Sequence, residues 1–453
     1  MKKRLLLLLL FMVFGFNGVH ARETPKQQTL FLNVKIFDGK SDQLISGQDV
    51  LVEGNHIVKI APEIKTNRMA RIIDGQGKTL MPGLIDAHTH LTAVKSFDEA
   101  IYKYEPAYIA ALATEAARRM LMRGFTTVRD AGGPVMGVKR AIDEGVIPGP
   151  RIFPSNAFVS QTGGHGDFDL TMTYLSPHFA GQLDKAYLFG WTMTADGVPE
   201  VRKAVREVLR SGASQVKIMA SGSITGAHDP LDVVEYTPEE MRAIVEEAEK
   251  WGTYAMAHAY SDAAVRTAVE AGVKTIEHGL MASPETLKLM KEKGAWLSTQ
   301  CLNYSKNAED FGVEMPASVA AKFNEAKQSA ERIFKLAKQY DIKMAWGTDG
   351  LGSLEVLDTQ SQEFTCRKKY FSDAEILKQA TSLNGELLTL SGKRSPYPDG
   401  SLGVVEEGAY ADLLIVDGNP LRDIGLLTQS EKTLRFIMKD GKIYKNTLIA
   451  GKH

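Results

Sequence analysis

Residues 81–90 read Met81-Pro82-Gly83-Leu84-Ile85-Asp86-Ala87-His88-Thr89-His90, an apolar strand that ends in two histidines one residue apart. Side chains at positions i and i+2 of a strand point to the same face. The two imidazoles therefore lie side by side at the carboxyl end of this strand. Imidazole is the commonest protein ligand for zinc and related divalent ions. The stretch predicts a metal site, and two exposed histidines after a buried strand are the alternative.

Strands and helices alternate around this stretch, from about residue 81 to residue 396. Helix starts between the strands are well marked: Thr237-Pro238-Glu239-Glu240 combines a capping threonine, a proline at the first helical position and a glutamate at the third. Eight βα units predict an α/β fold of the (β/α)8 TIM-barrel type. A doubly wound open sheet is the alternative, but no glycine-rich phosphate loop follows the first strand. The expected strands are 83–87, 126–129, 151–154, 215–219, 254–257, 275–277, 296–299 and 343–346.

Both ends of the chain have a different texture from this middle. Residues 50–60 read as two strands around Gly54-Asn55, a hairpin signal, and residues 436–444 read as strands around Asp440-Gly441. We therefore expect one small β-sandwich domain built from residues 22–82 and 397–453, with the barrel domain at 83–396.

The first 21 residues have the parts of a secretory signal peptide. Lys2, Lys3 and Arg4 precede an apolar stretch at 5–16, and small residues flank His20 in Val19-His20-Ala21. The stretch is short for a membrane span, and no cysteine near the cleavage point suggests a lipid anchor. We expect cleavage after Ala21, export to the periplasm or the medium, and no stable membrane anchor afterwards. An uncleaved anchor is the alternative.

Composition narrows the class of partner. The 453 residues carry a net charge of −1, which does not favour binding to nucleic acid or to an anionic membrane surface. A small-molecule substrate is expected, and a homo-oligomer remains open. Cys301 and Cys366 are the only cysteines. They could pair in an oxidising compartment, but connectivity does not follow from sequence, and we expect buried free thiols.

Metal-binding side chains recur at the ends of the expected strands. Active sites of such barrels lie at the carboxyl ends of the strands. The histidines and the aspartate would therefore converge into a divalent metal site that retains open positions. The residues concerned are His88, His90, Lys217, His258, His278 and Asp349.

Lys217 is the most specific of these signals. It stands between Val216 and Ile218 in an apolar strand, where a bare ammonium is costly to bury. Reaction with carbon dioxide would turn it into a carbamate, an anionic ligand able to bridge two metals. A barrel-core lysine paired with a carboxylate is the alternative.

Taken together, these motifs resemble the metal-dependent amidohydrolase superfamily, and most of all its branch of imidazolonepropionase-like and Xaa-Pro dipeptidase (prolidase-like) hydrolases. The resemblance covers nearly all of the chain after residue 21. It rests on residues 81–90 and on Thr126-Thr127-Val128-Arg129-Asp130, Thr162-Gly163-Gly164-His165-Gly166, Lys217-Ile218-Met219-Ala220-Ser221-Gly222, His258-Ala259-Tyr260, Ile276-Glu277-His278-Gly279, Gly347-Thr348-Asp349 and Ala409-Tyr410-Ala411-Asp412-Leu413.

The resemblance implies two divalent metal ions, zinc foremost, and N6-carboxylation of a lysine. The first ion would be held by His88, His90 and Asp349, and the second by His258 and His278. Carboxylated Lys217 would bridge the two ions. Single-metal imidazolonepropionases and many deaminases lack this lysine, so its presence argues against both activities.

Other residues are assigned by chemistry. Asp349 would act as general base and then general acid, and His165 and Tyr260 would stabilise the oxyanion of the tetrahedral intermediate. Arg129 would bind the α-carboxylate of a peptide substrate, or else form an ion pair with Asp130 or another carboxylate of the barrel wall.

The segment 166–199 is a long insertion rich in aromatic residues that would shape the substrate pockets. His178 and His228 stay unassigned. Ser223, Ser261 and Glu235 depart from the residues common in the family, which leaves specificity open.

We expect an amidohydrolase that cleaves dipeptides or N-acyl amino acids with proline or an apolar residue on the C-terminal side. A metal-dependent hydrolase of a lactone, carbamate or aryl amide is the alternative. A metal-holding binding protein without catalysis would lack Asp349 or Lys217.

Overall fold

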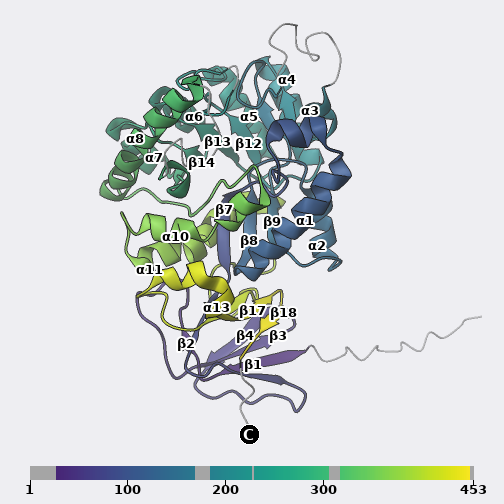
Figure 1. The fold of residues 1–453 in the computed structure, drawn as a ribbon, viewed down its shortest axis with the longest axis vertical. Helices are drawn as coiled ribbons and strands as arrows, with labels where there is room; N and C mark the ends of the chain where they lie inside the picture. The colour runs from purple at the N-terminus through teal and green to yellow at the C-terminus, as the bar shows by residue number, and fades with distance from the viewer. Residues whose placement is uncertain (1–26, 169–183, 227–228, 306–316, 449–453) are drawn as a thin grey trace, which may run out of the picture.

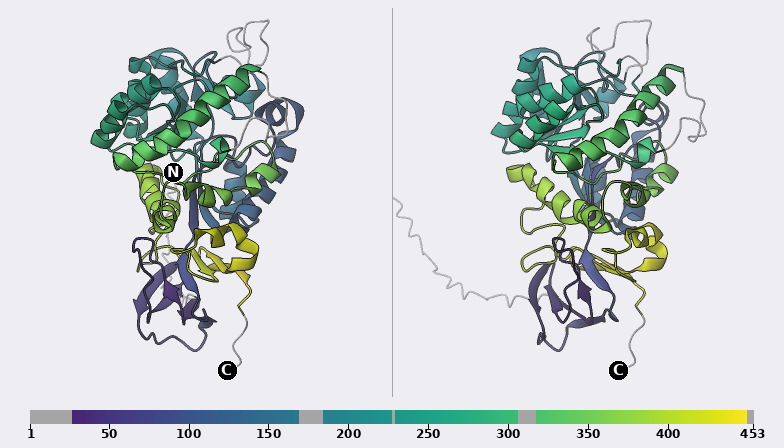
Figure 2. Two further views of the ribbon diagram at one scale, coloured as in Figure 1. Left: turned by 60° about the vertical axis from the view of Figure 1, so that its left-hand side comes forward. Right: turned by 90° about the vertical axis from the view of Figure 1, so that its left-hand side faces the viewer.

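The computed structural model describes residues 27–168, 184–226, 229–305 and 317–448. Figure 1 shows two regions: parallel strands with helices around them, and below them a group of mostly antiparallel strands. In Figure 2 the purple N-terminal and yellow C-terminal segments lie side by side in both views. The expected signal peptide lies outside the described residues.

The parallel strands form two sheets, which confirms the predicted α/β class. The smaller has the order β7-β8-β9, with bounds Leu84–Thr89, Phe125–Asp130 and Arg151–Pro154. The larger has the order β11-β10-β12-β13-β14-β15, with bounds Thr192–Thr194, Phe158–Ser160, Val216–Met219, Ala255–Ala259, Thr275–His278 and Trp296–Ser298.

Backbone hydrogen bonds connect these two sheets at two places. Ser214 N, just before β12, donates to Pro154 O of β9 over 2.7 Å. At the second place Met344 forms a parallel bridge with Leu297 of β15, and Ala87 N of β7 donates to Trp346 O over 2.9 Å. Each predicted strand coincides with an observed one except 343–346, which contributes only the bridge at Met344. Strands β10 and β11 were not expected.

Helices follow the parallel strands and cover their outer side (Figure 1). The helix start predicted at Thr237 is confirmed, because Thr237 forms a capping box with Glu240. Ser372 forms a second capping box, and Ser283 caps α7. The α-helices α1 to α7 span Pro106–Met122, Met136–Asp143, Lys185–Leu188, Gly197–Arg210, Pro238–Lys250, Asp262–Ala271 and Pro284–Lys293. Helices α8 to α13 span Ala317–Gln339, Leu354–Asp358, Gln362–Arg367, Asp373–Lys378, Asn384–Leu388 and Ser430–Thr433.

The other region consists of two sheets that share one hydrophobic cluster. Phe31 and Val50 of one sheet are buried in this cluster together with Leu80 and Phe436 of the other. The first sheet has the order β4-β3-β1-β5, with bounds His56–Ala61, Asp49–Glu53, Gln28–Leu32 and Arg71–Asp74. The second has the order β18-β17-β16-β6-β2, with bounds Lys442–Asn446, Leu434–Lys439, Leu413–Val416, Thr79–Pro82 and Lys35–Ile36, so it draws on both ends of the chain.

Among the described helices, none combines the length and the apolar character needed to cross a bilayer.

Cys301 and Cys366 form a disulfide, with their Cα atoms 5.8 Å apart. The expectation of free thiols is therefore wrong, because the two residues meet only in the folded chain. Cys301 follows β15 and directly precedes the short 3-10 helix at Leu302–Tyr304, while Cys366 lies in α10. Glu363 of α10 also accepts hydrogen bonds from the backbone N–H groups of Cys301 and Leu302. The segment around residue 301 is thus tied to α10 twice.

Replacing both cysteines by alanine should lower the free energy of unfolding by about 4 kcal/mol, because the bond closes a loop with a sequence separation of 65. Urea unfolding measures the effect. Dithiothreitol should shift the wild-type midpoint to that of the variant and leave the variant unchanged. An unchanged wild-type midpoint under reductant would contradict the assignment of the bond.

Candidate functional site

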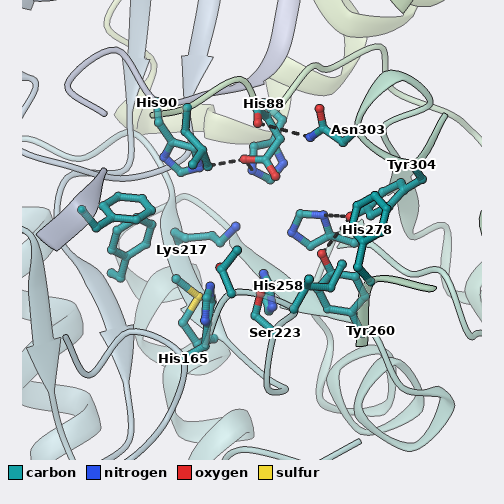
Figure 3. A pocket seen from close by; sticks show the side chains of 18 of the residues that line it. His88, His90, His165, Lys217, Ser223, His258, Tyr260, His278, Asn303 and Tyr304 are labelled. Atoms are coloured by element: carbon teal, nitrogen blue, oxygen red, sulfur yellow. Dashed lines mark hydrogen bonds and ion pairs between the residues drawn. The ribbon is translucent and has the colours of Figure 1, made fainter. Parts of the chain in front are cut away.

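Eight of the nine residues that the sequence singled out line one cavity of about 310 Å³ at the carboxyl ends of the parallel strands. Figure 3 shows His88 and His90 on one side, His165 and Ser223 on the opposite side, and the amine of Lys217 between them. Arg129 is the exception. The eight that line the cavity are His88, His90, His165, Lys217, His258, Tyr260, His278 and Asp349.

His88, His90 and Asp349 form a compact donor group whose ligand atoms all lie within 4.8 Å of one another. Nε2 of His88 and of His90 lie 3.4 Å and 3.2 Å from Oδ1 of Asp349. Within the described part of the chain, Nε2 of His88 is buried without a hydrogen-bond partner. Gly347 passes so close to His88 that an added Cβ would lie 2.8 Å from the Cβ of His88. A divalent cation would satisfy these donors.

The second ring nitrogen of these histidines is fixed by a hydrogen bond. Nδ1 of His88 donates to Glu277 over 2.7 Å, and Nδ1 of His90 donates to Gly132 O over 2.9 Å. Nδ1 of His278 lies 2.8 Å from Oε1 of Gln300, which accepts its proton. In each ring Nε2 is therefore left with a free lone pair. Such partners are what orient metal-ligating histidines and set their tautomers.

Glu277 is completely buried and shared between His88 and Arg129. Burial raises the pKa of its carboxyl group, but Arg129 and His88 outweigh burial and hold the pKa well below its ordinary value. Glu277 is thus ionised. Its Oε1 accepts from Arg129 over 2.8 Å, while its Oε2 accepts from His88.

The structure contradicts a substrate-binding role for Arg129. Its guanidinium is fully buried and donates to Ala87 O, Tyr254, Thr275 and Glu277, so no part of its planar fork faces the cavity. The alternative ion pair with a carboxylate of the barrel wall is the one observed, with Glu277 rather than Asp130 as the partner.

Lys217, His258 and His278 form the other part of the polar site. Burial lowers the pKa of Lys217 to about 8, although Glu277 and Asp349 partly offset it. Lowering the pKa enlarges the minor fraction of neutral amine, the form that adds to carbon dioxide, near neutral pH. Burial also lowers the pKa of His278 to about 3 and that of His258 well below its ordinary value. Both imidazoles are neutral, as metal ligands must be.

His258 differs from the other ring donors in which nitrogen is free. Its Nε2 lies 3.4 Å from the carbonyl oxygen of Gly222, so Nδ1 is the atom left for a ligand. Its ring stacks on that of His165 with 4.5 Å between centroids and lies edge-on to His278 at 4.6 Å.

His165 is held in place through its backbone and its ring. The backbone N–H of His165 donates to Glu235 over 2.7 Å, and Nδ1 lies 3.4 Å from Oδ2 of Asp229. Burial raises the pKa of Asp229, but His165 and the Ser223 N–H outweigh burial and lower it. Burial raises the pKa of Glu235 to about 8.

Tyr260 closes the side of the cavity opposite Lys217. Its ring stacks on His278 at 4.9 Å, and its hydroxyl lies 2.7 Å from that of Tyr304. Burial raises its pKa, so the hydroxyl keeps its proton and can donate it in a hydrogen bond. Asn303, the residue before Tyr304, donates to the backbone carbonyls of Thr348 and Asp349.

The rest of the cavity wall is apolar. Phe97 and Phe168 stack at 5.1 Å, and Phe158 lies 5.7 Å from the ring of His90. The insertion at 166–199 contributes Phe168 to this wall, while its residues 169–183, His178 included, lie outside the described residues, as does His228. The apolar lining residues are Phe97, Phe158, Phe168, Met219, Ile224, Val319, Phe323, Leu351 and Val356.

Sequence reasoning missed Glu277 because it assumed regular strand alternation. Neighbouring residues of a strand point to opposite faces, yet both Glu277 and His278 approach His88. His278 has a left-handed φ of 71°, and Asp349 has a φ of 50°, so the backbone turns at both residues. The position of Glu277 directly before His278 at a strand end was the available signal. Asp229, Gln300 and Tyr304 gave none.

The converging imidazoles, the partly buried Asp349 and the lysine define the class of the protein: a hydrolase of the type that works with divalent metal. The model of the Amidohydrolase family matches residues 79–453, and the chain belongs to this family.

Relatives agree with this membership. Ochratoxinase from Aspergillus niger is 32% identical over 384 residues, covering 81% of this chain and 75% of the relative. A prolidase crystallised with N-methylphosphonate-L-proline is 35% identical, with a TM-score of 0.84 and coverage of 93% of this chain and 100% of that one. A Xaa-Pro dipeptidase crystallised with methionine is 29% identical, with a TM-score of 0.79 over 93% of this chain and 100% of that one.

Arg129→Met should lower the free energy of unfolding by about 3 to 5 kcal/mol, because it leaves the buried charge of Glu277 without its partner. Urea unfolding of the metal-free protein measures this. The double variant Arg129→Met/Glu277→Gln removes both charges and should recover much of the loss. Unchanged stability together with a large rise in KM would instead support substrate binding by Arg129.

Glu235→Gln should stabilise the protein in a pH-dependent way. The carboxyl pKa rises from 4.5 unfolded to about 8 folded, so the native chain keeps a proton that the unfolded chain releases. Stability is therefore lost as pH rises through this window, by about 1.4 kcal/mol for each unit of pKa difference. Unfolding at about pH 5 and about pH 8 should show a gain for the variant that is larger at about pH 8. A gain independent of pH would refute this.

Proposed function

We propose that this protein is a two-metal amidohydrolase that cleaves the C–N bond of dipeptides or N-acyl amino acids with proline or an apolar residue on the C-terminal side. The observation that carries the proposal is Lys217: a buried lysine with a lowered pKa, facing the same cavity as two groups of histidines. Single-metal imidazolonepropionases and many deaminases lack a lysine at this place. A carbamate on Lys217 would supply the anionic bridge between the two groups.

The fold supports this proposal. The two parallel sheets, linked by backbone hydrogen bonds at two places, are compatible with the (β/α)8 barrel that we propose over residues 83–396. The two sheets that share a core are compatible with the β-sandwich that we propose for 22–82 and 397–453. The disulfide agrees with export after cleavage at Ala21, because such bonds persist in oxidising compartments.

The residues present fit two divalent ions, zinc foremost. His88, His90 and Asp349 would hold one ion, while Nδ1 of His258 and Nε2 of His278 would hold the other, with carboxylated Lys217 between them. When bound, such ions polarise a carbonyl and lower the pKa of water, which gives a nucleophile at neutral pH.

The chain's own groups then move the proton and hold the developing charge. Asp349 takes a proton from the attacking water as the water oxygen bonds to the carbonyl carbon. The tetrahedral oxyanion would accept hydrogen bonds from Tyr260 and from His165, whose side chains both line the cavity; His165 donates from Nε2 when its ring carries a proton there as well as on the Nδ1 that faces Asp229. Asp349 then passes the proton to the amide nitrogen as the C–N bond breaks, which releases an acid and an amine.

The preference for an apolar C-terminal side rests on the cavity wall and on relatives. The wall of phenylalanine and aliphatic side chains favours apolar substituents over charged ones. The related prolidase was crystallised with a proline derivative, and a Xaa-Pro dipeptidase shares the fold.

The proposal is tested by offering the zinc-loaded mature protein a panel of Xaa-Pro dipeptides, Xaa-apolar dipeptides and N-acyl amino acids, and measuring their hydrolysis. Lactones, carbamates and aryl amides are assayed alongside as the alternative substrates. Asp349→Asn and Lys217→Met should each reduce kcat by at least about 10³-fold, because they remove the proton carrier and the bridging ligand. Circular dichroism should show the fold intact. Turnover by purified Asp349→Asn would exclude the mechanism.

Carbamate formation has a readout of its own. Wild type equilibrated with ¹³C-bicarbonate should give a carbamate carbon signal that Lys217→Met lacks, and metal analysis should find two ions per chain. One ion per chain without a carbamate signal would exclude the two-metal proposal.

A further inference from the structure

We propose that Lys322, on α8, is a positioning residue that sets the place of the His165 imidazole through Asp229 and the segment 222–226. The part that His165 plays in the reaction rests on the proposed function, whereas the contacts that carry this inference do not. Lys322 and Asp229 lie outside the residues that line the cavity, and nothing in the sequence pointed to either of them.

Lys322 binds backbone rather than a carboxylate. Its Nζ donates to three carbonyl oxygens: Ser223 O and Gly226 O at 3.2 Å each, and Asp229 O at 2.7 Å. An ammonium has three N–H donors, and these contacts use all of them. The single ammonium group thus contacts the backbone of the segment 222–226 and the backbone of Asp229 at the same time.

The segment 222–226 packs closely against Asp229 and Pro230. A Cβ added to Gly226 would lie 1.6 Å from Oδ1 of Asp229, and one added to Gly222 would lie 2.0 Å from Pro230 O. The Asp229 carboxylate is therefore enclosed by the backbone that Lys322 holds. A shift of that backbone moves the carboxylate.

Asp229 connects the segment 222–226 to His165, which lines the cavity. Its Oδ2 accepts a hydrogen bond from the Ser223 N–H over 2.7 Å and lies 3.4 Å from Nδ1 of His165. One face of the His165 ring stacks on His258, with 4.5 Å between ring centroids. Among the described residues the Asp229 carboxylate is the charged group beside Nδ1 of His165, at ion-pair rather than hydrogen-bond distance, and we infer that it guides the direction in which Nε2 points.

The same helix and the same segment also form part of the cavity wall. Val319 and Phe323 of α8 line the cavity next to Ile224 and Thr225. Lys322 lies between the two α8 residues in sequence and holds the segment against the helix. His165 and Ser223 accordingly lie together on one side of the cavity (Figure 3).

Lys322→Met keeps the length of the side chain and removes the donors, so it tests the tether directly. We expect kcat on the best amide substrate to fall about tenfold to a hundredfold, as a small misplacement of a catalytic group does, with bound metal unchanged. Lys335→Met is the matched control on the same helix, because Lys335 is 69% exposed and pairs only loosely with Glu331 at 4.0 Å. It should leave kcat unchanged.

A double-mutant cycle shows whether Lys322 acts through His165. If it does, Lys322→Met should cost little further activity once His165→Asn is present. Effects of the two changes that multiply would overturn the inference and reduce Lys322 to a structural residue.

Chemical rescue separates position from folding. In Lys322→Cys the new thiol is the free one, since Cys301 and Cys366 are paired. Alkylation with 2-bromoethylamine restores an ammonium at nearly the length of lysine and should restore kcat, whereas iodoacetamide should not. Equal activity after the two treatments would contradict a role for the charge.

A readout independent of turnover separates this inference from the proposed function. In protein labelled with ¹³C-histidine, the ring signal of His165, assigned by its loss in His165→Asn, should shift or broaden in Lys322→Met and stay unchanged in Lys335→Met. An unperturbed signal overturns the inference even if the amidase activity is confirmed. A perturbed signal sustains it even if no amide is cleaved.

Discussion

The geometry of the site depends on one buried carboxylate, that of Glu277. A charge without solvent is tolerated only when partners neutralise it and use its lone pairs. Arg129 supplies the positive counter-charge and donates a hydrogen bond to one carboxylate oxygen, and Nδ1 of His88 donates its proton to the other oxygen. The consequence is directional: the proton of His88 is held away from the cavity, and its Nε2 faces Asp349. A neutral residue at position 277 would leave the tautomer of His88 undecided and Arg129 without a counter-charge.

The same logic extends around the cavity, with a different partner for each ring. Gly132 O holds His90 and Gln300 holds His278, both through Nδ1, while Gly222 O faces Nε2 of His258. Because these partners belong to different elements, the free ring nitrogens converge only in the complete fold. Lys217 then lies among imidazoles and anionic carboxylates, in a place where burial leaves a positive charge poorly solvated and lowers the pKa of the amine.

Strand periodicity and the rule that such sites lie at strand ends were enough to predict seven of the parallel strands and the six candidate metal ligands that line the cavity. The errors have physical causes. Arg129 was placed correctly on its strand, but the direction of its side chain follows from Glu277, whose own orientation depends on the left-handed backbone at His278. The disulfide joins residues whose approach depends on how α10 packs. Lys322 is one of many helix lysines, and nothing in its sequence context distinguishes it.

Different elements of the fold supply the polar donors and the apolar wall of the cavity. The polar donors come from the ends of β7, β12, β13 and β14 and from the segment after Met344. The apolar wall comes largely from connecting segments and from α8, through side chains such as Phe97, Phe168 and Phe323. In α/β folds with the site at the carboxyl ends of parallel strands, the strands position the reacting groups and the loops shape the substrate pocket. A shared fold therefore extends to the bond-breaking chemistry more safely than to the substrate. Lys322 joins α8, which forms part of the apolar wall, to the segment beside Asp229. In the role that we propose for Lys322, a change of this wall that accommodates a new substrate would also move His165. Substrate selection and the positioning of His165 are therefore coupled.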